Sequence, residues 1–351
     1  MLSNALPVAL FAGAAMAACP LAVDIAGADD HVVHVSVTNN GDEAVTFFKG
    51  NTVLSEHSTL DLLVDDAEGN SLPFEGLFVN YKRIGVAPEM FQTLQPGESV
   101  TGSVNAAKTY NLDKVEQAQV TAIQGFRYVT GAVAPTSLAE TEFCESETSS
   151  PFTITPDQSK VASDLLTHEP SFDSRIKKRS VTYSSCTTAQ TTSLKTSVSD
   201  AISMSSAAYT AAASSADYFT TWFKSTSVLT KVRTIYNDVA NVQTTSPKIS
   251  CTDTYGDCSD GSALLYTVPS ANVIVPCPNN GFWDFPEYSA DCTDFDYDRA
   301  GSILHESTHL YGTDDYAYGP TAAKKLSAAQ AAANADTYEM YAGSVRLGGC
   351  S

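Results

Sequence analysis

The sequence predicts an α+β fold in two parts. A β-sandwich-like region precedes residue 180, and a mainly helical domain with a small β-sheet follows over residues 180–351. Apolar residues recur with period two over strand lengths in the first part, and with helical spacing over most of the second. A basic cluster at residues 175–179 separates the two parts of an otherwise acidic chain.

Residues 1–18 contain an apolar run that ends in the small residues Ala15-Met16-Ala17. The run is too short to span a bilayer as a stable helix, and no later apolar run approaches 18 residues. We therefore predict a cleavable signal peptide over residues 1–18, a secreted, extracellular protein and no membrane partner. Cleavage after Ala17 and cleavage after Ala18 fit the sequence equally well.

The region of residues 19–179 is predicted to be β-rich. Its short apolar stretches are separated by turn sequences such as Asn39-Asn40-Gly41, a pattern typical of a small β-sandwich. The clearest stretches are residues 31–37, 43–48, 59–64 and 99–104. Ser, Thr and Pro become frequent from about residue 145, so we predict a linker over residues 145–179.

The basic cluster of residues 175–179 ends in Lys178-Arg179. In a secreted precursor, such a cluster within a polar linker indicates cleavage by a dibasic-specific processing protease. Cleavage after Arg179 would remove residues 19–179 as a propeptide that assists folding and holds the enzyme inactive. The alternative is a solvated charge run that is never cut, so that the β-rich region stays attached as a permanent adhesion or inhibitory module.

The domain of residues 180–351 begins with helical patterns. Two strand-like stretches and a short helix with two histidines follow. Ser327 and Gln330 form a possible capping box at the N-terminus of the last helix. The expected helices are residues 192–225, 226–242, 298–311 and 328–345, and the expected strands are residues 262–268 and 271–275.

The stretch of residues 298–319 carries the clearest chemistry. In His305-Glu306-x-x-His309, a helix places both histidines on one face, where two imidazole nitrogens converge on one zinc ion. Glu306 would point past the metal, where an unligated carboxylate can take a proton from water. Gly312 lets the chain turn back, and Asp315 is the candidate third ligand.

Tyr318 follows Asp315 by three residues and is placed to donate its phenol to a developing oxyanion. A five-residue H-E-x-x-H match alone arises by chance in many proteins. The predicted helix, together with Gly312, Asp315 and Tyr318 directly after it, favours a metal site over a chance match. Zinc endopeptidases commonly pair an extended substrate with an edge strand, and residues 262–268 and 271–275 are the candidate for it.

These residues resemble the aspzincin pattern of the fungal deuterolysins, which are secreted zinc endopeptidases made as pre-pro-enzymes. The resemblance covers the motif, its continuation Gly312-Thr313-x-Asp315-x-x-Tyr318-Gly319, and Asn334-Ala335-Asp336-x-Tyr338. It also covers residues 94–100, which look like a recurrent part of the deuterolysin prosegment.

The resemblance implies a zincin-like catalytic domain with one Zn²⁺ ion. It assigns the zinc ligands as His305, His309 and Asp315, the base as Glu306, and the stabiliser of the tetrahedral intermediate as Tyr318. Asp336 is the rival for the third ligand, and otherwise a residue that orients a histidine.

One feature departs from the deuterolysin pattern. The gap between His309 and Gly312 is shorter than in the longer deuterolysins, and the resulting H-E-x-x-H-x-x-G-x-x-D spacing also resembles the snapalysin-type metzincins of bacteria. A snapalysin-like protease is therefore the alternative within the zinc peptidases, although the flanking Tyr318-Gly319 disfavours it.

Eight cysteines in a chain with a signal peptide indicate disulfides formed in an oxidising compartment. Two precede Arg179 and six follow it, so cleavage there leaves even numbers on both sides. Six cysteines allow 15 pairings, which the sequence alone does not choose among. The deuterolysin resemblance implies three pairs: Cys186 with Cys251, Cys258 with Cys277, and Cys292 with Cys350.

The chain has 20 basic and 40 acidic residues, a formal net charge of −20. From residue 180 onward there are 9 basic and 17 acidic residues, a net charge of −8. This acidity argues against a nucleic-acid partner and would attract basic proteins, although it equally keeps a secreted protein soluble. We expect a monomer that acts on protein or peptide substrates, basic ones included.

The sequence therefore predicts a secreted, zinc-dependent metalloendopeptidase that hydrolyses internal peptide bonds and is activated by cleavage after Arg179. The rival from another class is a non-catalytic secreted zinc-binding protein. Its structural site would need a fourth protein ligand. Glu306 and the lack of a fourth histidine or cysteine nearby argue against it.

Overall fold

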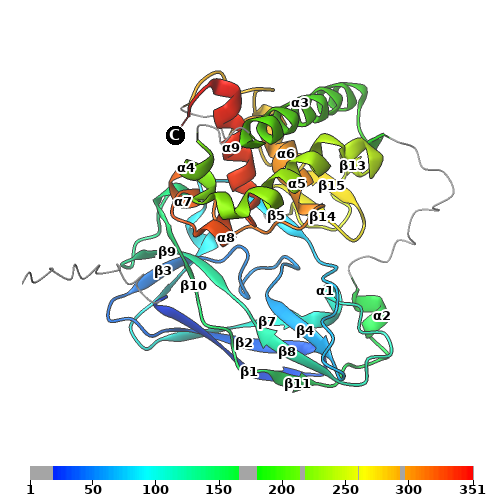
Figure 1. Cartoon of the computed structure of the whole chain (residues 1–351). Helices are drawn as coiled ribbons and strands as arrows, with labels where there is room; N and C mark the ends of the chain where they lie inside the picture. The colour runs from blue at the N-terminus through cyan, green and yellow to red at the C-terminus, as the bar shows by residue number, and fades with distance from the viewer. Residues whose placement is uncertain (1–18, 166–179, 214–217, 260, 293–296, 351) are drawn as a thin grey trace, which may run out of the picture.

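The computed structural model describes residues 19–165, 180–213, 218–259, 261–292 and 297–350. The predicted signal peptide and the whole basic cluster, including Arg179, lie outside the described residues. We call residues 19–165 the N-terminal half and residues 180–350 the C-terminal half. Figure 1 shows the β-rich N-terminal half in blue to green, packed against a C-terminal half in which helices lie against a sheet.

The N-terminal half contains three antiparallel sheets around its own apolar core. In β2, alternate valines point inward, as the period-two pattern requires. The first sheet is β1 (Leu21–Asp29), β2 (Val32–Asn39) and β7 (Ser99–Asn105). The second is β10 (Glu142–Glu145), β9 (Gly125–Thr130), β3 (Val45–Phe48) and β6 (Phe91–Leu94). The third is β11 (Phe152–Ile154), β8 (Ala118–Ala122) and β4 (Leu62–Asp66). The short helices α1 (Ala106–Thr109) and α2 (Val161–Asp164) complete this half, with two 3-10 turns at Pro88–Met90 and Leu138–Glu140.

In the C-terminal half, α6 packs against α3, α5 and α9, and α9 in turn packs against α4 and α7. Aromatic rings fill the space between the helices, and the Tyr236 ring contacts those of both Tyr338 and Tyr341. The α-helices are α3 (Thr188–Ala213), α4 (Phe219–Phe223), α5 (Leu229–Ala240), α6 (Arg299–His309), α7 (Gly319–Ala323), α8 (Ala328–Ala331) and α9 (Ala335–Leu347). Three 3-10 turns lie at Thr226–Val228, Val242–Thr244 and Phe282–Asp284.

A five-stranded sheet supports these helices and joins the two halves. Its order is β12 (Thr182–Ser184), β13 (Lys248–Ser250), β15 (Val273–Pro276), β14 (Ala263–Val268) and β5 (Phe78–Tyr81). The first three strands run parallel, and β14 runs antiparallel to β15. The edge strand β5 comes from the N-terminal half and pairs antiparallel with β14.

The predicted fold class, a mainly helical domain with a small sheet behind a β-sandwich, is wrong. Among the described residues, helices including 3-10 turns account for 32% and strands for 27%, and these strands build four sheets. A β-rich N-terminal region is present, but it has three sheets rather than the two of a sandwich. The error has a physical cause, because strands were predicted from local sequence pattern alone. The strand β5 is only four residues long, and it pairs with β14, which lies some 180 positions later in the chain.

Several element boundaries also differ from expectation. The helix expected over residues 328–345 is broken into α8 and α9 at Asn334, whose side-chain oxygen accepts hydrogen bonds from the backbone N–H groups of Tyr316 and Ala317. The capping box of Ser327 and Gln330 is present. Part of the predicted linker is folded, because β11 pairs with β8 and α2 follows it.

Four disulfides connect the eight cysteines. One pair, Cys19–Cys144, lies within the N-terminal half. The other three lie within the C-terminal half and are the pairs that the deuterolysin resemblance implies: Cys186–Cys251, Cys258–Cys277 and Cys292–Cys350. Among the described helices, none is both long and apolar enough to cross a membrane.

Candidate active site

Helix α6 has a capped N-terminus and is followed by a glycine turn. Asp298 caps its N-terminus by accepting a hydrogen bond from the Gly301 N–H (2.6 Å), and the chain turns away at Gly312 with φ +87°. A Cβ at Gly301 would lie 2.7 Å from Glu339 Oε1, so glycine there lets α9 approach closely. The two helices therefore hold the histidines of α6 and the carboxylates of α9 in one rigid unit.

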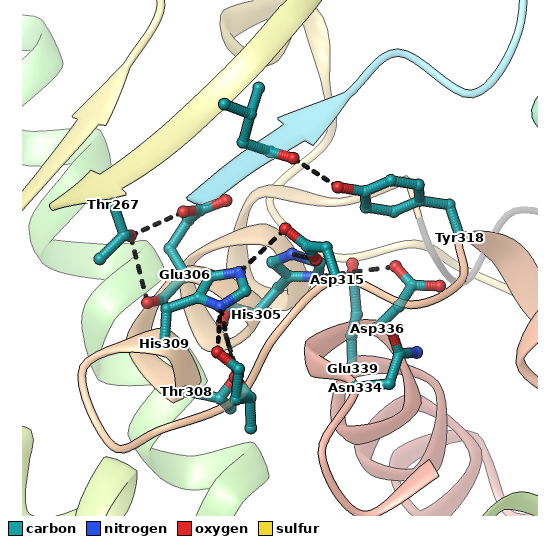
Figure 2. A network of polar contacts seen from close by, with 12 residues as sticks. Thr267, His305, Glu306, Thr308, His309, Asp315, Tyr318, Asn334, Asp336 and Glu339 are labelled. Atoms are coloured by element: carbon teal, nitrogen blue, oxygen red, sulfur yellow. Dashed lines mark hydrogen bonds and ion pairs between the residues drawn. The ribbon is translucent and has the colours of Figure 1, made fainter. Parts of the chain in front are cut away.

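The structure brings His305, His309 and Asp315 together as a cluster, which we call the ligand cluster (Figure 2). His305 Nε2 lies 3.2 Å from Asp315 Oδ1, and His309 Nε2 lies 3.4 Å from Asp315 Oδ2. One ligand atom from each residue lies within 4.8 Å of the others. All three side chains are buried.

The ligand cluster fits a metal ion. Both Nε2 atoms and both Asp315 oxygens are buried without a hydrogen-bond partner among the described residues. His309 Nδ1 donates to the Thr313 carbonyl (2.9 Å), so in the neutral ring Nε2 carries the lone pair, on the side of Asp315. Although burial opposes it, the neighbouring His309 and His305 hold the pKa of Asp315 well below its ordinary value. Two imidazole nitrogens and one carboxylate are a donor set typical of a catalytic zinc site.

Glu306 lies beside the ligand cluster, outside the set of converging atoms. Its Oε2 accepts a hydrogen bond from Thr267 Oγ1 on β14 (2.6 Å), and its Oε1 has no partner among the described residues. Burial raises the pKa of the Glu306 carboxyl above its ordinary value, while the two histidines oppose the rise. A carboxylate whose pKa lies closer to neutrality is a better proton acceptor for catalysis.

Tyr318 is buried beside His305, and the two rings are nearly parallel with centroids 6.2 Å apart. Its phenol donates to the Val79 carbonyl of β5, as Figure 2 shows. The Arg127 guanidinium lies 4.4 Å above the ring centroid. Burial raises the pKa of the phenol well above its ordinary value, so it remains a neutral donor.

Asp336 lies on the other side of His305. Its Oδ1 is 3.5 Å from His305 Nδ1, whereas the ligand cluster is formed at Nε2. Glu339 Oε2 is also 3.5 Å from Nδ1. Both carboxylates are ion-paired with Arg83 from the N-terminal half, and Glu339 is 2.9 Å from it. We call Arg83, Asp336 and Glu339 the arginine cluster.

A cavity of about 350 Å³ borders the ligand cluster between the two halves. It is lined by Asp315 and Tyr316 from the C-terminal half and by Phe78 and Gln124, among others, from the N-terminal half. There is thus space beside Asp315 for water or part of a ligand.

The comparisons with known proteins agree with this geometry. A family model for aspzincins, described as lysine-specific metallo-endopeptidase, matches residues 208–343. A neutral protease 2 homologue of Sclerotinia sclerotiorum is 33% identical over 93% of this chain and 90% of its own length. The chain belongs to the aspzincin family. Further neutral protease 2 homologues are 31% identical in Botryotinia fuckeliana (93% of this chain, 92% of the relative) and 33% identical in Phaeosphaeria nodorum (93% and 91%).

As an aspzincin, the protein is a metalloendopeptidase that acts on proteins or peptides. The resemblance to deuterolysins is confirmed, and neither the snapalysin-type alternative nor the non-catalytic one is supported.

Sequence reasoning missed several residues of this aspzincin's site. Thr267 gave no signal, because its contact with Glu306 depends on how β14 packs on α6. Phe78, Arg83 and Arg127 come from a part of the chain more than 150 positions away. Of these missed residues, Glu339 alone could have been found from the sequence. It lies three residues after Asp336, so a helix places both carboxylates on one face.

Proposed function

We propose that this aspzincin is a secreted, zinc-dependent endopeptidase made as a pre-pro-enzyme, with residues 1–18 as signal peptide, residues 19–179 as propeptide and residues 180–351 as the mature enzyme. The observation that carries the proposal is the convergence of two imidazole nitrogens and a carboxylate, none of which has a hydrogen-bond partner among the described residues, with Glu306 beside them.

In this proposal His305, His309 and Asp315 hold one zinc ion. When bound, zinc supplies a Lewis acid that polarises the scissile carbonyl and lowers the pKa of a nearby water. Glu306 takes a proton from that water as it attacks the carbonyl carbon, and gives the proton to the leaving amine when the C–N bond breaks. Thr267 donates a hydrogen bond to Glu306 Oε2, so Oε1 is the oxygen that would accept the proton from water. Tyr318 donates its phenol to the carbonyl oxygen as negative charge develops on it.

Asp336 is not a ligand in this proposal. It lies near Nδ1 of His305 and would orient that ring so that Nε2 faces the metal. Its replacement should weaken metal binding without removing a donor from the ligand cluster.

Secretion and processing have separate support. Four disulfides fit an oxidising compartment. Each disulfide lies within one half, so cleavage between the halves would leave no covalent connection between them. Contacts from the N-terminal half to Tyr318 and His309 support a role in holding the uncut enzyme inactive. The net charge of −8 after residue 180 favours basic protein substrates.

The test combines intact mass, zinc content and hydrolysis of a basic protein, each with and without a chelator. We expect a secreted species that starts at Ser180, carries one zinc and loses hydrolysis with the chelator. Glu306→Gln should keep the zinc and lower the turnover by about 10²–10⁴-fold. Asp284→Asn, an exposed control, should change neither. A chain that binds zinc but shows no hydrolysis even after cleavage at Arg179 would contradict the proposal.

A further inference from the structure

We propose that residues 78–83 occupy the groove in which an extended peptide substrate binds, and that this segment acts as a built-in, substrate-like inhibitor. The proposal rests on the proposed function, because it takes the N-terminal half to be a propeptide. It goes further by naming the inhibitory segment and the contacts that hold it.

The main chain of the segment is bound as a substrate strand would be. The pairs Phe78–Thr267, Val79–Tyr266 and Asn80–Leu265 align β5 antiparallel to β14. The Lys82 N–H extends the pairing by donating to the Ser262 carbonyl (2.9 Å). Without β5, β14 would be an open sheet edge, and an open edge binds an extended peptide through main-chain hydrogen bonds.

The segment also covers groups of the candidate site. The Phe78 ring stacks on the His309 ring, with centroids 4.6 Å apart and planes 4° from parallel. The Val79 carbonyl accepts the Tyr318 phenol (Figure 2). A scissile peptide would present the same kind of group, a main-chain carbonyl, to that phenol. The segment therefore uses the donor that the proposed function assigns to the substrate.

Arg83 anchors the C-terminal end of the segment. Its guanidinium is buried and ion-paired with Asp336 and Glu339 of α9, which lie against His305 Nδ1. Removing the arginine would leave two carboxylates buried side by side without this cation, which is strongly unfavourable. The arginine cluster therefore favours the covered state of the groove.

The first arm of the test uses the full chain loaded with zinc. Hydrolysis of a protein substrate is measured before and after cleavage at Arg179 for the wild type, for Arg83→Ala, and for Lys108→Ala, a control that removes an exposed positive charge of the same half outside the segment. Because breaking a buried ion pair is costly, we expect Arg83→Ala to raise the activity of the uncut chain about 10-fold or more. Lys108→Ala should leave it unchanged.

The second arm does not depend on the folding of the Arg83 variant. A synthetic peptide of residues 76–85 is added to the cut wild-type enzyme, alongside the same peptide with Arg83→Ala or Lys82→Ala. We expect competitive inhibition by the wild-type and Lys82→Ala peptides, and inhibition at least about 10-fold weaker by the Arg83→Ala peptide. Inhibition that is absent, non-competitive or equal for all three peptides would overturn the inference. A wild-type chain that stays inactive after cleavage would contradict the proposed function instead.

Discussion

The two sides of His305 both face buried carboxylates, but the partners of these carboxylates differ. On the Nε2 side, the ligand cluster brings a second histidine and Asp315 together, and its donor atoms have no hydrogen-bond partner among the described residues. On the Nδ1 side, Asp336 and Glu339 are already ion-paired with Arg83. Both sides are fully buried, so each needs positive charge to be stable.

The difference bears on which site would persist after the proposed cleavage. Every member of the ligand cluster comes from the C-terminal half, so a metal bound there would stay if the N-terminal half were released. The arginine cluster draws its cation from the N-terminal half, so cleavage and release would remove it. Under the proposed function, one imidazole ring would thus connect a metal site with a site whose cation, Arg83, is present only before activation.

The largest effects should come from removing one carboxylate on each side. Asp315→Ala should lose both zinc and activity, because it removes a donor from the ligand cluster. Asp336→Ala should keep zinc at full loading, with an affinity about 10–100-fold lower, because it removes only the partner of a ligand. Zinc titration against a competing chelator measures both. If Asp336→Ala loses the metal while Asp315→Ala keeps it, the assignment of the two sides is reversed.

A smaller effect should come from Tyr318→Phe, which removes the donor above the ligand cluster and leaves its ligands intact. We expect kcat to fall about 10²–10³-fold with unchanged zinc content. The matched control is Tyr316→Phe on the same loop, whose hydroxyl donates to Asp314 at 3.5 Å. Equal losses in both variants would show that the loop tolerates no change, and would refute a specific role for the Tyr318 phenol.

The smallest effect should come from replacing Asp61, and it concerns stability rather than activity. Asp61 is a third buried carboxylate, and its side-chain hydrogen-bond partners are neutral. It accepts hydrogen bonds from Gln124 (3.0 Å) and Thr59 (3.1 Å), and burial raises its pKa to about 6. Since the folded state holds this proton to a higher pH than the unfolded chain, the free energy of unfolding falls as pH rises from 3.8 to about 6.

Asp61→Asn should abolish that fall, which amounts to about 3 kcal/mol for a shift of this size. Urea unfolding of variant and wild type at pH 4 and pH 7 measures the difference between them. The exposed Asp24→Asn serves as control. A variant that gains no stability relative to wild type at pH 7 would show that Asp61 is stabilised as the anion.

The sequence predicted the convergence of His305, His309 and Asp315 better than the fold around them. His305 and His309 are four residues apart on one helix, and Asp315 follows a short turn, so local spacing brings them together. The arginine cluster joins residues 256 positions apart, and no local pattern encodes such a pairing. The same holds for β5, whose four residues gain their place in the sheet only from β14.

The proposed function places the metal on the Nε2 side of His305. Anomalous diffraction at the zinc edge, from crystals of the secreted protein, tests it most directly. We predict one zinc bound by His305 Nε2, His309 Nε2 and an Asp315 oxygen, at about 2.0–2.2 Å each, with the fourth position open to water. Zinc at His305 Nδ1 with Asp336 and Glu339, or zinc enclosed by a fourth protein ligand, would contradict the account.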